Sequence, residues 1–313
     1  MGNLLKNHAI LLIFWCGGIF LSHFASAESP APSQKVAVYF PEAREPYKTI
    51  YQEILDGASS ADNIEVVPKV LSNGFDTAEI VEELSSEGIS RVIALGREGY
   101  KLAKSLPDNV KVVSGALPIR PNGISGISLI SDPDKLFSFL EQVAPEVKTV
   151  HIAYSESSAW LIGLAEKAAQ NHGLVLNAIK VENTGEAIKF YNQLFESSVS
   201  KSDAIWLPLD KVSSHDKVTL PLILEKAWAK EIVVFSSKPS HAKRGALFST
   251  YPNNVALGKR LAQMVNSLAS SAENKKFSAL KSMHLAVNLR TAAHLGLNYT
   301  KEQQDAFEVT FPE

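Results

Sequence analysis

Two stretches of the chain repeat the same order of apolar and polar positions. At Lys148–Gly173 a compact apolar run, of the kind that a buried parallel strand needs, leads into a polar loop and then into apolar residues at helical spacing. Lys35–Ala61 has the same order, with a strand over Val36–Phe40 and a helix after a Pro-containing loop. The pattern predicts that an α/β lobe begins twice, and a small molecule would most naturally bind between two such lobes.

Strands and helices alternate through the rest of the chain, which indicates parallel βαβ units. The expected strands include Ile64–Leu71, Arg91–Leu95, Val110–Ser114, Ile124–Leu129, Leu174–Val181, Ala204–Leu207, Ile232–Ser236, Gly245–Ser249 and His284–Val287. The expected helices include Thr77–Glu87, Tyr100–Leu106, Lys135–Val143, Glu186–Phe195, Leu220–Ala229 and Val255–Ala269, with Gly96–Gly99 as a tight turn. We therefore expect an α/β fold of two Rossmann-like lobes, each a parallel sheet flanked by helices.

The first 27 residues have a different pattern. Lys6 supplies a basic start, Ala9–Leu21 is a short apolar run, and Ala25–Ala27 is a small-x-small cleavage signal. The apolar run is shorter than the roughly 20 residues that a membrane-spanning helix needs, which argues against an anchor. We expect residues 1–27 to be a cleaved signal peptide and residues 28–34 to be a flexible leader.

This expectation gives a first testable prediction. The exported protein should begin at Glu28, because cleavage is expected directly after Ala27. N-terminal sequencing of the exported protein measures this. A mature protein that still contains Cys16, which is the only cysteine of the chain, would show the prediction to be wrong.

Composition and motifs narrow the classes of function. The chain has 313 residues, enough for two domains, and a net charge of -2, which gives no electrostatic case for nucleic acid. The eight histidines include no HExxH motif, and no Walker A, GxGxxG or G-x-S-x-G motif is present. We therefore expect no metal, no cofactor and no catalytic residue, and predict that the protein is not an enzyme.

Several segments are similar to one known family. Val287–Leu297 resembles the Asn-Leu-x-Thr-Ala-x-x-Leu-Gly ending of the ABC-transporter substrate-binding family typified by tryptophan- and tyrosine-type binding proteins, which has a type I periplasmic-binding-protein fold. Lys243–Leu247 and Leu207–Asp210 resemble its segment between the lobes and its Pro-x-Asp loop. The chain departs from the family at Arg97-Glu98 and at Pro118–Pro121, where Arg97 and Arg120 would suit a more acidic ligand than the amino acid that the family implies.

The resemblance implies an architecture and a function. The chain would cross a hinge three times, with lobe one at 35–129 plus 249–280 and lobe two at 130–248 plus 281–313. The expected protein is a periplasmic monomer that closes on a small polar, amino-acid-like ligand and delivers it to an ABC permease. A sensory receptor of the same fold, signalling to a membrane sensor kinase, is an alternative. A periplasmic α/β enzyme is a further alternative, against which the absence of a catalytic motif argues.

The candidate ligand-binding residues of lobe two lie in loops that follow strands. Ser157 and Ser158 are expected at a helix start, where hydroxyls and free N–H groups can hold a carboxylate or simply cap the helix. Trp160 can stack on a ligand ring or belong to the core. Asp210 follows a buried strand and can pair with a ligand ammonium group or serve as a turn residue.

Lobe one offers candidates in equivalent loops. Arg97 can clamp a carboxylate with two hydrogen bonds, or remain a solvated surface residue. Arg44 and Tyr47 belong to the loop after the first strand. Because loops leave a parallel sheet at the carboxyl ends of its strands, the loops of each lobe should gather at one edge.

Overall fold

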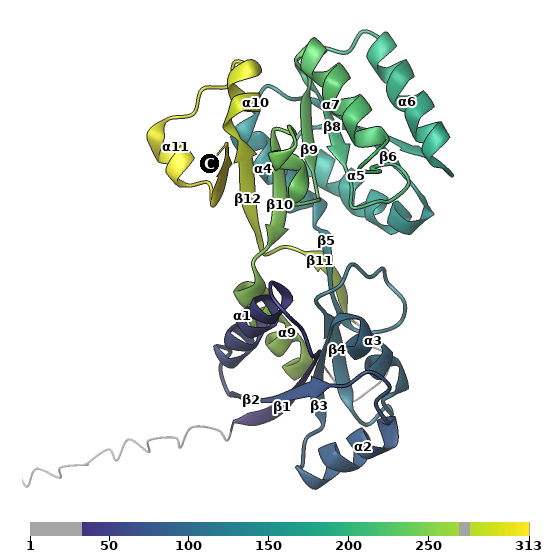
Figure 1. Ribbon diagram of the computed structural model, residues 1–313, viewed down its shortest axis with the longest axis vertical. Coiled ribbons are helices and arrows are strands. Elements are labelled where there is room, and N and C mark those ends of the chain that lie inside the picture. The colour runs from purple at the N-terminus through teal and green to yellow at the C-terminus, as the bar shows by residue number, and fades with distance from the viewer. Residues whose placement is uncertain (1–32, 269–275, 313) are drawn as a thin grey trace, which may run out of the picture. The chain divides into compact units, whose positions relative to one another are not determined.

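The computed structural model describes residues 33–268 and 276–312, and its strands form two separate sheets (Figure 1). The six-stranded sheet contains β1 (Gln34–Pro41), β2 (Ile64–Leu71), β3 (Arg91–Leu95), β4 (Lys111–Gly115), β5 (Gly126–Ser131) and β11 (Phe277–Leu280), in the order β11-β5-β4-β3-β1-β2. The seven-stranded sheet contains β6 (Thr149–Tyr154), β7 (Val175–Lys180), β8 (Asp203–Leu207), β9 (Val233–Ser236), β10 (Phe248–Pro252), β12 (Met283–Asn288) and β13 (Val309–Phe311), in the order β13-β12-β10-β9-β8-β6-β7. The predicted signal peptide lies outside the described residues.

Helices connect most of these strands. They are α1 (Tyr47–Ser59), α2 (Thr77–Ser86), α3 (Gly96–Ser105), α4 (Pro133–Val143), α5 (Ile162–Asn171), α6 (Thr184–Glu196), α7 (Thr219–Lys230), α8 (Ser240–Lys243), α9 (Asn254–Asn266), α10 (Leu289–His294) and α11 (Lys301–Asp305), with a 3₁₀ helix η1 (Glu156–Leu161). The strands pair in parallel, apart from the antiparallel pair β10–β12. The predicted α/β class with two largely parallel sheets is confirmed.

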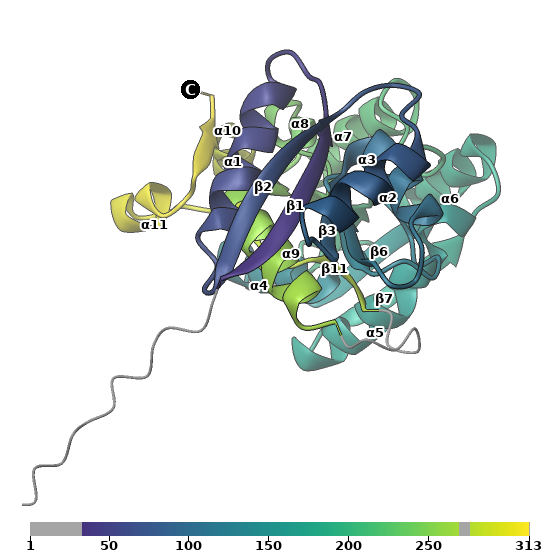
Figure 2. The same cartoon turned by 90° about the horizontal axis from the view of Figure 1, so that it is seen from below.

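Strand β1 shows why its sequence is apolar at nearly every position. Val36 and Val38 belong to the cluster that contains Ile54 of α1 and Leu257 of α9, whereas Ala37 belongs to the cluster under α2 and α3. Figure 2 shows β1 and β2 with α1 and α9 on one side and α2 and α3 on the other. Both faces of the strand are therefore covered, which is what a continuous apolar run predicts.

The seven-stranded sheet is covered in the same way. Trp206 and Phe235 lie on the face under α4 and α5, with their rings stacked at 6.4 Å, and Phe137 of α4 meets the Trp206 ring edge-on at 5.7 Å. Ile205 and Val234 lie in the cluster under α6 and α7. Alternate side chains of neighbouring strands thus fill two separate layers, which fixes the register of the sheet.

The chain passes from one sheet to the other three times, between β5 and α4, between β10 and α9, and between β11 and β12. Strand β5 extends to Ser131, and β10 lies in the seven-stranded sheet although the sequence assigned residues 249–280 to lobe one. The exact lobe boundaries stay a prediction.

Among residues 33–268 and 276–312, no helix has the length and hydropathy to cross a membrane.

One local prediction is wrong, and one of the alternatives for the serine loop is excluded. Gly96–Gly99 is not a separate turn, because Gly96 has a φ of +70° and the chain turns at this residue directly into α3. Neither Ser157 nor Ser158 caps a helix, because both lie inside η1 and α5 begins only at Ile162. Ser155 occupies the N-cap position of η1 without a capping bond, since its hydroxyl is bonded to Asp210 instead.

Candidate ligand-binding site

A cavity of about 1120 Å³ is lined by loops that follow strands of both sheets. From the six-stranded sheet come the start of α3 and the β4–β5 loop, including Arg97 and Arg120. From the seven-stranded sheet come η1, the β8–α7 loop and the residue after Ser237, Lys238. Ligands of open α/β sheets bind outside the carboxyl ends of the strands, and these loops leave their strands at that end.

Asp210 ties two of these loops together. Its Oδ2 accepts hydrogen bonds from the Ser155 amide (2.8 Å), the Ser155 hydroxyl (2.7 Å) and the Ser158 hydroxyl (2.9 Å). Its Oδ1 accepts from the amides of Val212 (2.8 Å) and Ser213 (3.1 Å). Burial alone would raise the pKa of Asp210, but the bonds from Ser155, Ser213 and Val212 outweigh it and hold the pKa below its usual value. The ionised carboxylate therefore fixes the β6–η1 loop against the β8–α7 loop.

The structure thus brings Asp210 and the predicted serine loop together, as the adjacency of β6 and β8 requires. Ser157 is exposed, lines the cavity and lies 2.8 Å from the Ser155 hydroxyl. Ser158 is buried, and its hydroxyl donates a hydrogen bond to Asp210. Of the two predicted serines, Ser157 is therefore the one that lines the cavity. Ligand contact by Asp210 and by either serine stays a prediction.

Trp160 is not among the residues that line the cavity. Its ring meets that of Phe277 of β11 edge-on at 5.6 Å, and it packs against the small apolar cluster of Ile130, Leu161 and Ala279. Phe277, Ile130 and Ala279 belong to strands of the six-stranded sheet and Leu161 belongs to η1. These contacts favour the core alternative for Trp160 over a stacking platform for a ligand.

The three candidates from the first sheet separate in space. Arg97 is exposed in the first turn of α3 and lines the cavity. Arg44 and Tyr47 are exposed, Tyr47 to 62%, and neither is among the residues that line the cavity. The prediction of ligand contact is therefore supported by position for Arg97 and not for Arg44 or Tyr47.

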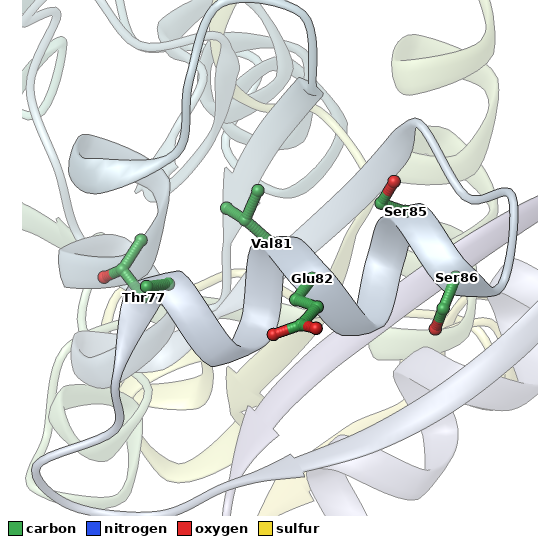
Figure 3. Close-up of a pocket in the computed structure, with 6 residues that line it drawn as sticks. Thr77, Val81, Glu82, Ser85 and Ser86 are labelled. Atoms are coloured by element: carbon green, nitrogen blue, oxygen red, sulfur yellow. The ribbon is translucent and has the colours of Figure 1, made fainter.

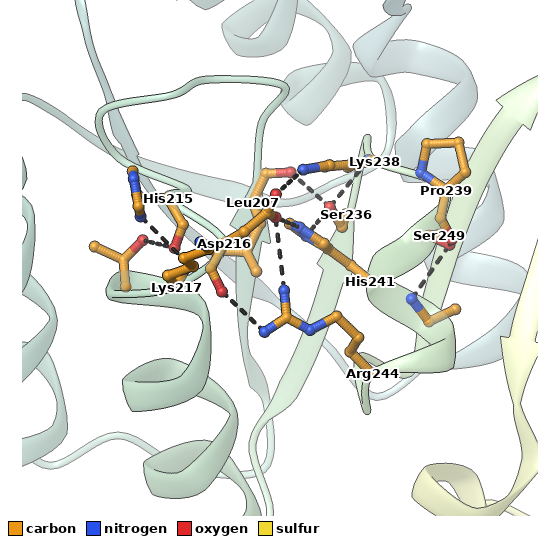
Figure 4. A network of polar contacts seen from close by, with 12 residues as sticks. Leu207, His215, Asp216, Lys217, Ser236, Lys238, Pro239, His241, Arg244 and Ser249 are labelled. Atoms are coloured by element: carbon orange, nitrogen blue, oxygen red, sulfur yellow. Dashed lines mark hydrogen bonds and ion pairs between the residues drawn. The ribbon is translucent and has the colours of Figure 1, made fainter.

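Asp216, which the sequence did not single out, is the centre of a polar network at the cavity wall (Figure 4). Its carboxylate pairs with the Lys238 ammonium and accepts from His241 Nε2 at 2.9 Å, and its backbone oxygen accepts from Arg244 at 2.8 Å. The Lys238 bond lowers the pKa of Asp216 to about 2, with a smaller contribution from His241 against the effect of burial. This network holds Lys238 on the cavity wall.

His241 supports this network from the interior. The ring is fully buried, and it lies 2.8 Å from the Ser236 hydroxyl through Nδ1. Burial lowers the pKa of His241, and the nearby Lys238 charge acts in the same direction, against the opposing Asp216 carboxylate. A neutral ring with its hydrogen on Nε2 donates to Asp216, so the histidine positions a carboxylate and does not itself reach the cavity.

A second hollow runs along α2 and is lined by residues of that helix alone, Thr77 and Glu82 among them (Figure 3). No polar groups converge on it from other elements, so we assign it no function. Within residues 33–268 and 276–312, no group of three or more His, Cys, Asp or Glu side chains is arranged to hold a metal ion.

Comparison with solved structures supports the fold. Solved structures with a similar fold include a ligand-free, open substrate binding protein with adhesive properties from Clostridium difficile, at 16% identity over 88% of this chain and 99% of that chain, with a TM-score of 0.58. Another is the ABC domain in complex with L-Trp from Streptococcus pneumoniae, at 17% identity over 89% of this chain and 100% of that chain, with a TM-score of 0.50. No curated protein sequence matches the chain.

The family assignment rests on sequence. The family model described as ABC transporter substrate binding protein matches residues 118–309, which is more than half of the chain. This match confirms the predicted family and, because the family is one of binding proteins, the prediction that the protein is not an enzyme. The chain belongs to the ABC transporter substrate binding protein family.

Proposed function

We propose that this protein is exported to the periplasm, binds a small polar ligand of amino-acid size in the cavity between its two sheets, and delivers it to an ABC permease. The observation that carries the proposal is the cavity itself, which is lined by strand-following loops of both sheets. A ligand that touches both sets of loops has a higher affinity for a form in which they lie close together. Its binding energy then stabilises that closed form, which is the form that a permease can recognise.

The residues divide into two roles under this proposal. Arg97 and Ser157 are the groups that contact a ligand carboxylate, because both line the cavity and Arg97 has no ion-pair partner among the described residues. Asp210 orients the β6–η1 and β8–α7 loops through its five hydrogen bonds. An ammonium group of the ligand would have to share a carboxylate that is already fully bonded, so Asp210 acts mainly through the loops.

Native mass spectrometry of the purified mature protein tests the function. We expect a bound small molecule that is released on denaturation, and calorimetry with that compound should show one site per chain. The radius of gyration measured by small-angle X-ray scattering should fall when the ligand is added, because closure compacts the protein.

The control is the variant Lys167→Gln, which changes an exposed lysine of α5 away from the cavity and should bind as the parent does. A protein that retains no small molecule, and whose radius of gyration does not change with any compound screened, would contradict the proposal.

A further inference from the structure

The cavity contains more cationic than anionic side chains. Its lining includes the five cations Arg97, Arg120, Lys211, Lys217 and Lys238, but only two carboxylates, those of Asp210 and Asp216. A cavity with this balance attracts negative charge, and the low net charge of the whole chain, -2, does not predict it.

Both carboxylates are already engaged by the protein. Asp210 accepts five hydrogen bonds from groups of its own two loops, and Asp216 is paired with Lys238 and His241. Lys238 is therefore neutralised by Asp216. The carboxylates of the cavity leave little acceptor capacity for a ligand ammonium group.

The other four cations have no ion-pair partner within residues 33–268 and 276–312. They are Arg97, Arg120, Lys211 and Lys217, and all four are exposed. The pKa of Glu156 is lowered mainly by its bond to Lys180, and Arg120 is the smallest of the causes. A ligand with acidic groups would supply what these four charges lack.

The four cations come from both sides of the cavity. Arg97 starts α3 and Arg120 lies between β4 and β5, so both belong to the six-stranded sheet. Lys211 and Lys217 lie in the loop between β8 and α7, which belongs to the seven-stranded sheet. One acidic group can reach one of these pairs, whereas two acidic groups at opposite ends of a molecule can reach both.

Neutral groups in the same loop also offer hydrogens. The Ser214 side chain is only 5% exposed, lines the cavity, and its hydroxyl has no partner among the described residues. His215 Nδ1 accepts from the Lys217 amide at 3.3 Å, which leaves Nε2 as the ring nitrogen that can donate. An orphaned buried hydroxyl costs free energy until a ligand satisfies it, so an acceptor-rich ligand fits this wall.

We propose that the ligand carries two acidic groups, with one held by Arg97 and Arg120 and the other by Lys211, Lys217 and Ser214. The inference rests on the proposed function, since it names the class of compound that the cavity takes. Carboxylate and phosphate groups share the chemistry that these residues recognise. A ligand of this class also removes the repulsion between the two cationic pairs when the loops approach each other.

Identification of the ligand released from the purified protein tests the proposal first. Its mass and fragmentation should show two acidic groups, as two carboxylates or as a carboxylate and a phosphate, and this distinguishes the two sources. Calorimetry should then compare that compound with its half-amide. We expect the half-amide to bind roughly 10-fold or more weakly, because one cationic pair loses its charged partner.

Variants test which residues are responsible. Arg97→Gln and Lys217→Gln should each weaken binding of the released ligand by roughly 10-fold, and the weakening should shrink in high salt. Their melting temperatures without ligand should match the parent's, because neither residue has an ion-pair partner to lose. Lys167→Gln is the charge-matched control and should leave the affinity unchanged.

The two proposals fail in different ways. A released ligand with one acidic group or none, or an unchanged affinity in both Arg97→Gln and Lys217→Gln, overturns the dianion inference while a cavity ligand still supports the transport function. If neither a released compound nor dicarboxylates from malonate to adipate bind to the cavity, both proposals are wrong.

Discussion

Replacing Asp210 by alanine should lower the free energy of unfolding of the ligand-free protein by about 3–5 kcal/mol, as expected when one partner of a buried, hydrogen-bonded charge network is removed. The buried carboxylate satisfies three backbone amides and two hydroxyls, and the methyl group of alanine satisfies none of them. Chemical denaturation of the ligand-free protein measures the change.

Asp210→Asn sharpens this experiment because it keeps the size of the side chain. Oδ1 and Oδ2 of Asp210 both face donors only, so either orientation of the asparagine amide points an NH₂ group at N–H or O–H donors. We expect a loss of stability close to that of Asp210→Ala. The matched control is Asp76→Ala, which removes an exposed cap bonded only to the Ala78 amide and should cost about 1 kcal/mol.

This result would distinguish the two roles that the sequence left open for Asp210, which are pairing with a ligand ammonium group and stabilising a turn. A residue that only pairs with a ligand ammonium group would lose affinity on substitution and leave the ligand-free protein as stable as before. The five internal hydrogen bonds favour the opposite outcome. Equal unfolding free energies for Asp210→Ala and the parent would remove the structural role that we assign to this carboxylate.

The positions of strands that are buried on both faces could be predicted from the sequence. Strand β1, for example, has helices over both faces, so its sequence is apolar almost throughout and its position was predicted within two residues. Strands β11 and β13 were missed because they have only four and three residues, and β11 also pairs with a distant part of the chain. Phe277 of β11, for example, is opposite Gly126 of β5, and a local pattern contains no information about such a pairing.

The candidate site was predictable to the level of loops. Parallel strands place their following loops at one edge, which is why the Asp210 loop and the serine loop meet. Which serine faces the cavity was not predictable, because a 3₁₀ turn stands where the sequence suggested a capped α-helix. The same limit applies to Arg44 and Tyr47, whose loop has the expected position in the chain but does not contribute to the cavity lining.

The Asp216 network was beyond the reach of sequence reasoning. Lys238 and His241 follow the central Asp216 by 22 and 25 residues, a spacing that matches no helix, turn or metal motif. Only the adjacency of the β8–α7 loop with the segment after β9 brings them together. Arg97 and Arg120 already suggested a more acidic ligand, but the contribution of Lys211 and Lys217 to the cavity was missed, since the net charge of a chain does not show where charges gather.

A second large loss of stability is expected from a substitution in the contact between helices α1 and α9. The two helices approach so closely that a Cβ at Gly258 would lie 1.9 Å from the Ile54 carbonyl oxygen, and a Cβ at Gly57 would lie 1.9 Å from that of Val255. Both neighbours are backbone atoms of helices, which cannot move aside without shifting a whole helix. We expect Gly258→Ala to lower the free energy of unfolding by about 3 kcal/mol or more.

Gly163→Ala is the matched control, because Gly163 is exposed in α5, has ordinary backbone angles, and has no atom within 4 Å of a Cβ. Helix propensity alone should make that variant more stable by about 0.5–1 kcal/mol. Urea unfolding of the two variants should therefore give changes of opposite sign for the same chemical substitution. If both variants were stabilised, the close contact of α1 and α9 would not exist in solution.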